Sequence, residues 1–202
     1  WRSTAGPPRP HDGARDALTV RELTEPMARM KPVRTRAIYA GSFDPITLGH
    51  LDIIQKALLT FDVVHVAVGI NPLKSGLFDP NERLDLIRRS VLDLELGGPR
   101  ELPPQVEIGA FQGESVIKYA RRIGATHIVR GLRQSSDFDD EFRYHGILGR
   151  LDPNMPMIHI ICRETFLHVS SSTARELASL GEDVSWLVTP SVEAALRGKA
   201  KS

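Results

Sequence analysis

The 202-residue chain has a single cysteine, Cys162, so no disulfide bond can form within it. One thiol without a partner is compatible with a reducing compartment such as the cytoplasm. Cys162 ends an apolar run at residues 157–162. This position predicts a thiol buried in the core rather than a catalytic one.

Long apolar runs and a strong net charge are also missing. The longest candidate run, residues 63–70, is strand-sized and is interrupted by His65 and Gly69, whereas a membrane helix needs about 20 apolar residues. The formal net charge is only +1, and no basic stripe is interleaved with aromatic residues. These absences argue against a membrane span and against a nucleic-acid-binding surface.

The composition divides the chain into two parts. Residues 1–34 hold five prolines and no sustained apolar periodicity. We expect them to be a disordered or non-native extension, or the end of an upstream segment. The chain as a whole has an ordinary globular composition, with 41% hydrophobic and 25% charged residues. Residues 35–202 are therefore predicted to form one folded domain.

Strands alternate with helices throughout the predicted domain. Apolar strands are expected at residues 37–40, 63–68, 106–110, 127–129 and 157–162, and helical periodicity or start signals lie between and after them. This alternation is typical of βαβ units with right-handed crossovers. It predicts an α/β fold, with three layers around a five-stranded parallel sheet of Rossmann-like topology.

Capping signals mark the starts of several helices. Asp79 precedes Pro80, and Glu82 follows three residues after Asp79, which is the spacing of a capping box. Thr173 and Glu176 have the same spacing and predict a second helix start. A last short helix is expected after Thr189.

The first strand runs into Gly-Ser-Phe-Asp-Pro-Ile-Thr-Leu-Gly-His at residues 41–50. Small residues at a helix start let backbone N–H groups approach a phosphate, and the helix dipole assists. His50, in the first turn of that helix, could reach the same phosphate. The alternative interpretation is an ordinary turn in which Thr47 caps the helix and His50 lies at the surface.

Cations and hydroxyl groups follow the other strands. Lys74 follows the second strand, Arg130 to Arg133 follow the fourth, and Ser170 to Ser172 come after the fifth. The carboxyl ends of parallel strands meet at one edge of a sheet, where such folds bind ligands. Guanidinium and hydroxyl groups suit phosphate oxygens. The arrangement therefore predicts a site for a phosphorylated ligand.

Together these motifs, with Arg-Gly-Leu-Arg at 130–133 and Glu141, resemble the phosphopantetheine adenylyltransferases of coenzyme A biosynthesis. That family belongs to the nucleotidyltransferases with an (H/T)xGH motif, here Thr47-Leu-Gly-His50. The resemblance covers about residues 36–196. It implies a nucleotidyltransferase domain that moves AMP from ATP to 4′-phosphopantetheine, by direct in-line attack, giving dephospho-coenzyme A and pyrophosphate.

The resemblance also implies roles for individual residues. His50 would stabilise charge at the α-phosphate, and Lys74 and Arg130 would act with it as the catalytic set. The acceptor would be bound by Ser42, Lys74, Val116 and Arg130. The implied ATP site consists of Ser42, Phe43, His50, Gly131, Leu132, Arg133, Glu141, Phe166, Leu167, His168, Val169, Ser170, Ser171 and Ser172.

The same resemblance implies Mg²⁺ carried by ATP without a dedicated protein metal site, and a cytoplasmic homo-oligomer, with a hexamer as the expected size. Asp137, Asp139, Asp140 and Glu141 are better explained as acids at a helix start than as metal ligands. The chain departs from the family at residues 111–116, where Glu114 and Ser115 replace an apolar stretch. Two alternatives stay open: another phosphorylated acceptor such as nicotinamide mononucleotide, or a non-catalytic nucleotide-binding module.

Overall fold

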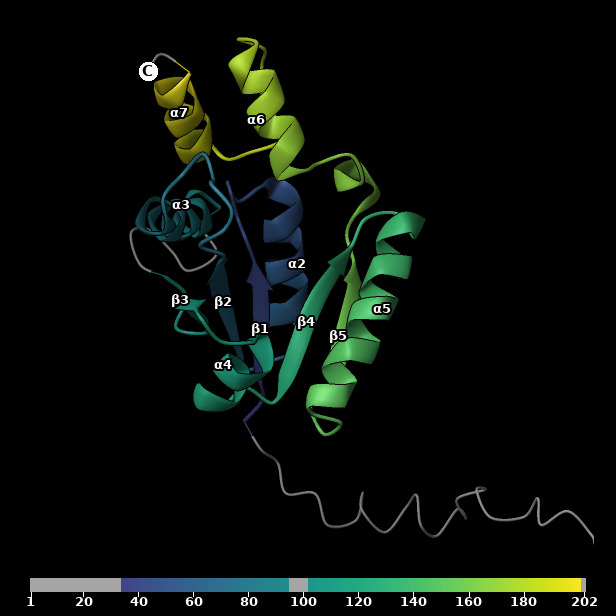
Figure 1. Ribbon diagram of the computed structural model, residues 1–202. Coiled ribbons are helices and arrows are strands. Elements are labelled where there is room, and N and C mark those ends of the chain that lie inside the picture. The colour runs from purple at the N-terminus through teal and green to yellow at the C-terminus, as the bar shows by residue number, and fades with distance from the viewer. Residues whose placement is uncertain (1–33, 95–101, 201–202) are drawn as a thin grey trace, which may run out of the picture. The chain divides into compact units, whose positions relative to one another are not determined.

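The computed structural model describes residues 34–94 and 102–200 (Figure 1). In chain order the elements are β1 (Arg36–Gly41), α2 (Leu48–Leu58), β2 (Val63–Ile70), α3 (Pro80–Asp93), β3 (Val106–Gln112), α4 (Val116–Arg122), β4 (His127–Leu132), α5 (Ser135–Leu151), β5 (Met157–Ile161), the short 3₁₀ turn η1 (Glu164–Phe166), α6 (Ser171–Ser179) and α7 (Pro190–Lys199). The expectation for residues 1–34 falls outside the described residues, except for Arg34, and stays a prediction.

The five strands form one parallel sheet in the order β3-β2-β1-β4-β5, which confirms the predicted architecture. The chain winds outward in one direction from β1 to β3 and then crosses back to β4. The pairing of β1 with β4 ends at Tyr39 and Val129, whereas β4 continues beside β5 as far as Leu132. The strands therefore separate at their carboxyl ends, where an open α/β sheet leaves a crevice for a ligand.

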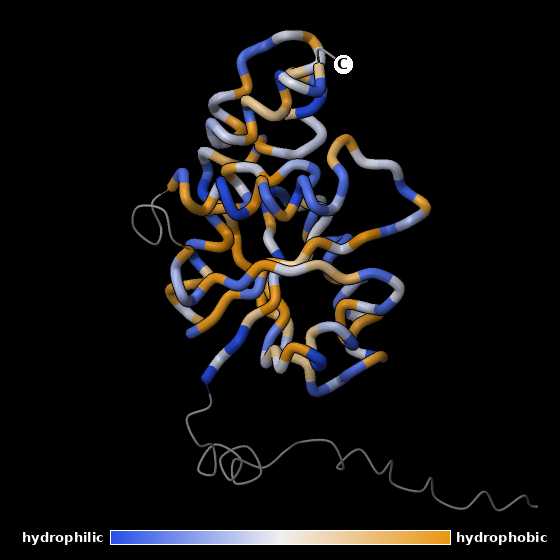
Figure 2. The backbone as a smooth tube through the Cα atoms, turned by 90° about the vertical axis from the view of Figure 1, so that its left-hand side faces the viewer, coloured by the Kyte–Doolittle hydropathy of each residue, from blue (hydrophilic) through white to orange (hydrophobic). Residues whose placement is uncertain are grey.

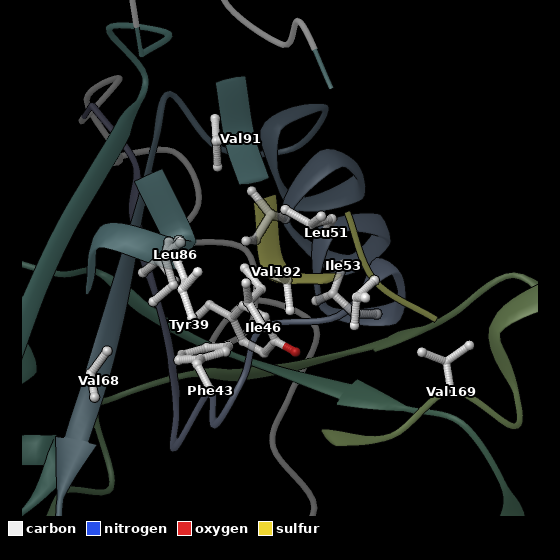
Figure 3. Close-up of a cluster of buried hydrophobic side chains, with 14 of the residues drawn as sticks. Tyr39, Phe43, Ile46, Leu51, Ile53, Val68, Leu86, Val91, Val169 and Val192 are labelled. Atoms are coloured by element: carbon white, nitrogen blue, oxygen red, sulfur yellow. The ribbon is translucent and has the colours of Figure 1, made fainter. Parts of the chain in front are cut away.

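Successive residues of the central strand face opposite layers, as the pleat of a strand requires. Tyr39 packs in a cluster with residues of α2, α3 and α7, and part of this cluster appears in Figure 3. Ile38 packs on the other face, in a cluster with residues of α4 and α5. In Figure 2 the strands are mostly hydrophobic in colour, while the helices alternate along their length. Both faces of the sheet are thus covered by amphipathic helices.

Four strands are longer than predicted, and β1 extends by one residue at each end, to Arg36 and Gly41. β2 and β3 each extend two residues further, where Gly69 and Ile70 pair with Phe111 and Gln112. β4 extends from the predicted end at Val129 to Leu132 because its ladder with β5 continues through Arg130 and Gly131, beyond the apolar run that was the basis of the prediction. Side-chain periodicity marks burial, whereas a strand ends only where its backbone hydrogen bonds end.

The helix-start predictions had two outcomes. The capping box before α3 is confirmed: the Asp79 carboxylate accepts from Asn81 N–H at 2.7 Å and Glu82 N–H at 3.0 Å, and Glu82 accepts from Asp79 N–H at 2.8 Å. The predicted start of α6 at Thr173 is wrong. Ser170 is the N-cap and accepts from Thr173 N–H at 3.0 Å, so the serines form the helix N-terminus.

The structure also bears on the burial of Cys162 and on membrane-spanning helices. Cys162 is 5% exposed, which confirms a thiol in the core, and burial raises its pKa. Within residues 34–94 and 102–200, every helix is too short or too polar to cross a bilayer.

A buried polar network explains one glycine in the sheet. His65 on β2 lies 3.1 Å from Glu107 Oε2 through Nδ1 and 2.9 Å from the Tyr119 hydroxyl through Nε2. A Cβ atom at Gly109 would lie 2.6 Å from the Tyr119 hydroxyl oxygen and 2.8 Å from His65 Nε2. Gly109 therefore makes room for this hydrogen bond, and His65 has a structural role.

We predict that Gly109→Ala lowers the free energy of unfolding by about 1–3 kcal/mol, because the methyl group must displace a buried hydrogen-bonded pair. Gly146→Ala is the matched control, because its new Cβ would meet no atom within 4 Å beyond its own helix backbone. That control should stabilise the fold by about 0.5–1 kcal/mol, since alanine is the better helix former. Chemical denaturation measures both, and effects of equal sign would contradict the account.

Candidate active site

A cavity of about 490 Å³, called the central cavity below, lies at the carboxyl ends of β1 and β4. Its walls come from β1 and the loop after it, the start of α2, the end of β4, the start of α5 and the start of α6. The predicted site residues that line it are Ser42, Phe43, His50, Arg130, Gly131, Arg133, Glu141, Val169, Ser170, Ser171 and Ser172. The structure thus brings together most of a set that spans 131 positions of the chain, from 42 to 172.

The other predicted site residues are not part of the lining of this cavity. Lys74 is exposed and lines a separate depression of about 400 Å³ beside the loop before α3. Val116 is buried at the start of α4, and Leu132 ends β4. In the segment before α6, Phe166 and Leu167 pack against the core and His168 is exposed. The roles assigned to these residues stay predictions.

Four residues that line the central cavity lie outside every site motif predicted from the sequence: Tyr39, Ala40, Ile53 and Arg175. Arg175 was detectable in principle. It follows Ser171 by four residues, so a helix that begins at Ser171 places both on one face. The wrong start at Thr173 concealed this relation.

The Thr47-Leu-Gly-His50 motif is itself a capping box, with His50 in the position that glutamate or glutamine often takes. The His50 backbone N–H donates to the Thr47 hydroxyl oxygen at 3.4 Å. The Thr47 backbone N–H donates to His50 Nδ1 at 3.1 Å. Because Nδ1 accepts this hydrogen bond, the proton of the neutral ring lies on Nε2.

The alternative interpretation was right about the Thr47 cap, but His50 is partly buried in the wall of the central cavity and packs against aromatic rings. Its ring centroid lies 5.1 Å from that of Phe43 and 6.3 Å from that of Tyr39. Removal from water lowers the pKa of His50, and the positive charge of Arg133 lowers it further, to about 4. At neutral pH the ring is therefore an uncharged donor through Nε2.

Arg130 is held in a fixed orientation by Glu141. Its Nε and Nη2 groups donate to the two carboxylate oxygens at 2.8 and 2.5 Å, and its Nη1 donates to the Ala40 carbonyl at 3.0 Å. The guanidinium also lies 5.2 Å from the centre of the Tyr144 ring. Such a bidentate pair leaves a planar cation with little rotational freedom at the cavity wall.

Arg133 is held by Asp137 in a similar way. The Asp137 carboxylate accepts from the Arg133 backbone N–H at 2.9 Å and from its Nε at 3.2 Å, and Arg133 Nη1 donates to the Val169 carbonyl at 3.2 Å. The acids at the start of α5 thus pair mainly with arginines: Glu141 with Arg130, Asp137 with Arg133 and Asp140 with Arg143. In the part of the chain that the structure describes, no three His, Cys, Asp or Glu residues gather as a metal site.

The start of α6 supplies the anion-attracting end of the cavity. Ser170 caps the helix, and Ser171 donates its hydroxyl to the Pro45 carbonyl at 2.7 Å. The first N–H groups of a helix have no partner within it, and the dipole adds partial positive charge there. Together with Arg133, this end of the cavity can bind phosphate groups.

The comparisons with known proteins agree with this chemistry. Residues 38–177 match the family model described as cytidylyltransferase-like. The chain is 42% identical to the phosphopantetheine adenylyltransferases of Chloroflexus aggregans and Chloroflexus aurantiacus, over 163 and 164 residues. Each alignment covers 81% of this chain and 95% of the relative.

Solved structures give the fold independently. A bifunctional NMN adenylyltransferase/ADP ribose pyrophosphatase from Francisella tularensis superimposes with a TM-score of 0.61 and 16% identity, over 84% of this chain and 51% of that one. The nicotinic acid mononucleotide adenylyltransferase of Plasmodium falciparum superimposes with a TM-score of 0.57 and 16% identity, over 83% and 96%. At these identities the similarity concerns the fold alone.

We predict that the low pKa of His50 makes the fold less stable in acid. The unfolded chain takes up a proton at His50 as the pH falls through about 6.5, whereas the folded chain does so only near pH 4. This difference costs about 2 kcal/mol of stability between pH 7 and pH 5. His50→Gln keeps an acceptor for the capping box but does not titrate.

Chemical denaturation of both proteins at pH 7 and pH 5 checks this prediction. The wild-type protein should lose about 2 kcal/mol more than His50→Gln, because the titration of all other groups is shared. An equal loss in the two proteins would show that His50 has an ordinary pKa in the folded state.

Proposed function

This chain belongs to the phosphopantetheine adenylyltransferases, within the cytidylyltransferase-like family, and we propose on that basis that it transfers AMP from ATP to 4′-phosphopantetheine. The products would be dephospho-coenzyme A and pyrophosphate. One observation carries the proposal: the central cavity combines an uncharged histidine donor, an orientated arginine and a serine-rich helix N-terminus at the switch point of the sheet. These are the groups that phosphoryl chemistry requires.

In the proposed reaction an oxygen of the acceptor phosphate forms a bond to the α-phosphorus of ATP. The bond from that phosphorus to the bridging oxygen breaks, and pyrophosphate leaves with the electron pair. The attacking oxygen already carries negative charge, so the step needs no protein nucleophile and no general base. Catalysis then depends on holding the two substrates in line and on stabilising charge in the transition state.

His50 is suited to stabilising that charge. Its Nε2–H is a donor at neutral pH, and its orientation is set in advance by the bond from Thr47 N–H to Nδ1. A donor that is already orientated loses little free energy through reorganisation as charge grows on the non-bridging oxygens. We assign His50 to these oxygens of the α-phosphate.

The acceptor phosphate is assigned to the side of the cavity formed by Ser42 and Arg130. Glu141 orientates Arg130 and leaves one N–H on each of its Nη atoms without a hydrogen-bond partner among the described residues. Lys74 is assigned to the same phosphate, although it lies in the neighbouring depression and must extend toward the cavity. Phe43, Gly131 and Arg133 are assigned to ATP.

Mg²⁺ is proposed to enter with ATP and to neutralise part of the phosphate charge. The carboxylates that line the central cavity, Asp137, Asp140 and Glu141, are each paired with an arginine, so phosphate oxygens and water would supply the ligands. A homo-oligomer, and a hexamer in particular, is a further proposal that light scattering would check. The exposed side chains of Phe138, Phe142 and Ile147 on α5 offer apolar surface that an assembly could cover.

The acceptor is tested by offering the purified protein Mg·ATP with either 4′-phosphopantetheine or nicotinamide mononucleotide. We expect dephospho-coenzyme A and pyrophosphate with the first acceptor and no adenylylated product with the second. Mass spectrometry identifies the products. Turnover with nicotinamide mononucleotide alone would assign the chain a different acceptor, and binding of ATP without turnover of either would favour a nucleotide-binding module.

Replacement of His50 by alanine should reduce turnover by about 100- to 1,000-fold, because a preorganised donor to transition-state charge is lost. Affinity for ATP, measured by calorimetry, should change much less, since the other phosphate contacts remain. Turnover close to that of the wild-type protein would remove His50 from the mechanism.

A further inference from the structure

Two of the groups assigned to the acceptor phosphate come from separate loops. Ser42, in the loop after β1, lines the central cavity, whereas Lys74 belongs to residues 71–77, called the Lys74 loop below. Every residue of the Lys74 loop is exposed. Among residues 34–94 and 102–200 the Lys74 ammonium group has no ion-pair partner. The position of Lys74 therefore depends on how the backbone of its loop is held.

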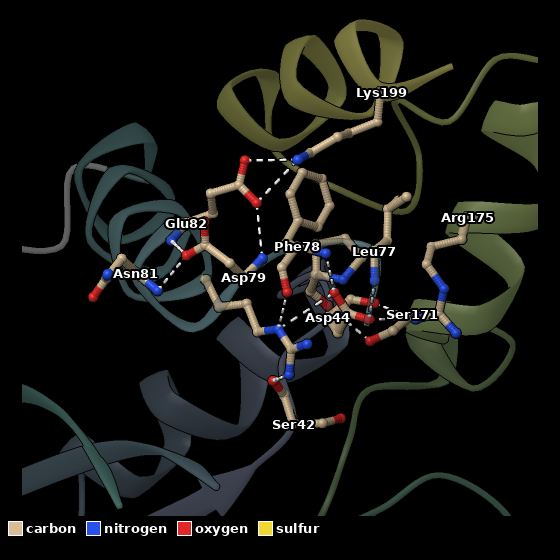
Figure 4. Close-up of polar contacts among 12 residues, drawn as sticks. Ser42, Asp44, Leu77, Phe78, Asp79, Asn81, Glu82, Ser171, Arg175 and Lys199 are labelled. Carbon is tan, nitrogen blue, oxygen red and sulfur yellow. Dashed lines mark hydrogen bonds and ion pairs between the residues drawn. The ribbon is translucent and has the colours of Figure 1, made fainter. Parts of the chain in front are cut away.

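The carboxylate of Asp44 holds the end of the Lys74 loop. Asp44 lies in the loop after β1 and is buried, and its two oxygens accept from Leu77 N–H and Phe78 N–H at 2.9 Å each. Figure 4 shows Asp44 at the centre of these contacts. The Phe78 side chain is also buried. One acidic side chain thus connects the loop after β1 with the point where the Lys74 loop leads into α3.

Arg83, in the first turn of α3, connects the same two loops. Its Nε donates to the Phe78 carbonyl at 2.7 Å and lies 3.4 Å from Asp44 Oδ1, and its Nη1 donates to the Ser42 carbonyl at 3.3 Å. The side chain is only 11% exposed and lines the depression that contains Lys74. A guanidinium group held by partners in several directions has little rotational freedom. Arg83 therefore fixes the spacing between the loop after β1 and the end of the Lys74 loop.

The Lys74 loop passes directly against this ion pair at Gly76. A Cβ atom at residue 76 would lie 1.8 Å from Arg83 Nη2 and 2.8 Å from Asp44 Oδ2. A side chain there would push Arg83 away from its partners, so glycine allows the backbone to approach the guanidinium group. Packing at Gly76 and hydrogen bonds at Phe78 thus hold the loop close to Lys74 in the sequence.

We propose that Arg83 is a positioning residue for the acceptor: with Asp44 it holds the Lys74 loop against the loop after β1, so that Lys74 and Ser42 act on one phosphate. This inference rests on the proposed function, which assigns both residues to the acceptor phosphate. Arg83 directs its donors at Asp44 and at two carbonyl oxygens, so it acts through the loops and not on the phosphate itself. A phosphate bound from two loops stays in line with ATP only while the loops keep their spacing.

The test is a double-mutant cycle with Arg83→Met and Lys74→Met, read as kcat/KM for 4′-phosphopantetheine. Each single variant should lower kcat/KM by about 10- to 100-fold, because a charge-assisted contact to the acceptor is lost or displaced. The change should divide between KM and kcat in the same proportion in both variants. The double variant should lose little more than either single variant, since Arg83 acts through Lys74. Arg83→Lys should restore part of the loss, because it keeps the charge without the fork.

Arg89→Met is the matched control, because Arg89 is an exposed arginine of the same helix that pairs with Asp85 at 2.7 Å. It should leave kcat/KM unchanged, and calorimetry should find ATP affinity within about twofold of the wild-type value in every variant. Limited trypsin digestion adds a measurement that needs no acceptor. Cleavage after Lys74 gives a fragment that begins at Ser75, and Arg83→Met should accelerate it by about 10-fold, because the loop opens more often.

Additive losses in the cycle would overturn the inference in favour of a general structural role for Arg83. A normal kcat/KM in Lys74→Met, or an unchanged rate of cleavage after Lys74 in Arg83→Met, would overturn it as well. Absence of turnover by the wild-type protein would instead contradict the proposed function. The trypsin comparison would still decide whether Arg83 holds the loop.

Discussion

The capping box formed by Thr47 and His50 is the interaction on which the rest of the site depends. It begins α2 directly after the first strand, and it also uses Nδ1 of the imidazole as the acceptor for a backbone N–H. One local hydrogen bond therefore starts the helix, directs the ring between Tyr39 and Phe43 and assigns its proton to Nε2. Burial keeps the ring uncharged, so the helix-start motif also supplies the hydrogen-bond donor that we propose acts on the α-phosphate.

The sheet supplies the place where this donor can act. β4 leaves β1 after Val129 but stays paired with β5, and the crevice that opens is closed on its far side by the N-terminus of α6. Carboxylates then hold the arginines of this crevice: Glu141 holds Arg130, and Asp137 holds Arg133. The acids of α5 thus act on the ligand indirectly, by fixing the cations that would contact it.

The sequence was informative wherever a local rule decides the structure. Apolar periodicity predicted all five strands, and the Asp79 box predicted the start of α3. Prediction failed where several neighbouring residues could cap the same helix equally well, or where a position depends on contacts with residues distant in the sequence. Four hydroxyl residues in succession can each cap a helix, so the start of α6 was placed at Thr173 and Arg175 was missed. The separation of Lys74 from the cavity depends on how its loop packs, which no local pattern encodes.

The central claim is that His50 is an uncharged donor through Nε2 under the conditions of the reaction. Nitrogen-15 NMR of the histidine side chains, from pH 5 to pH 8, measures this directly. The account predicts that the His50 signals show a protonated Nε2 and an unprotonated, hydrogen-bonded Nδ1 throughout this range, because the pKa of His50, about 4, lies below it. A doubly protonated ring at neutral pH, or a proton on Nδ1, would contradict it.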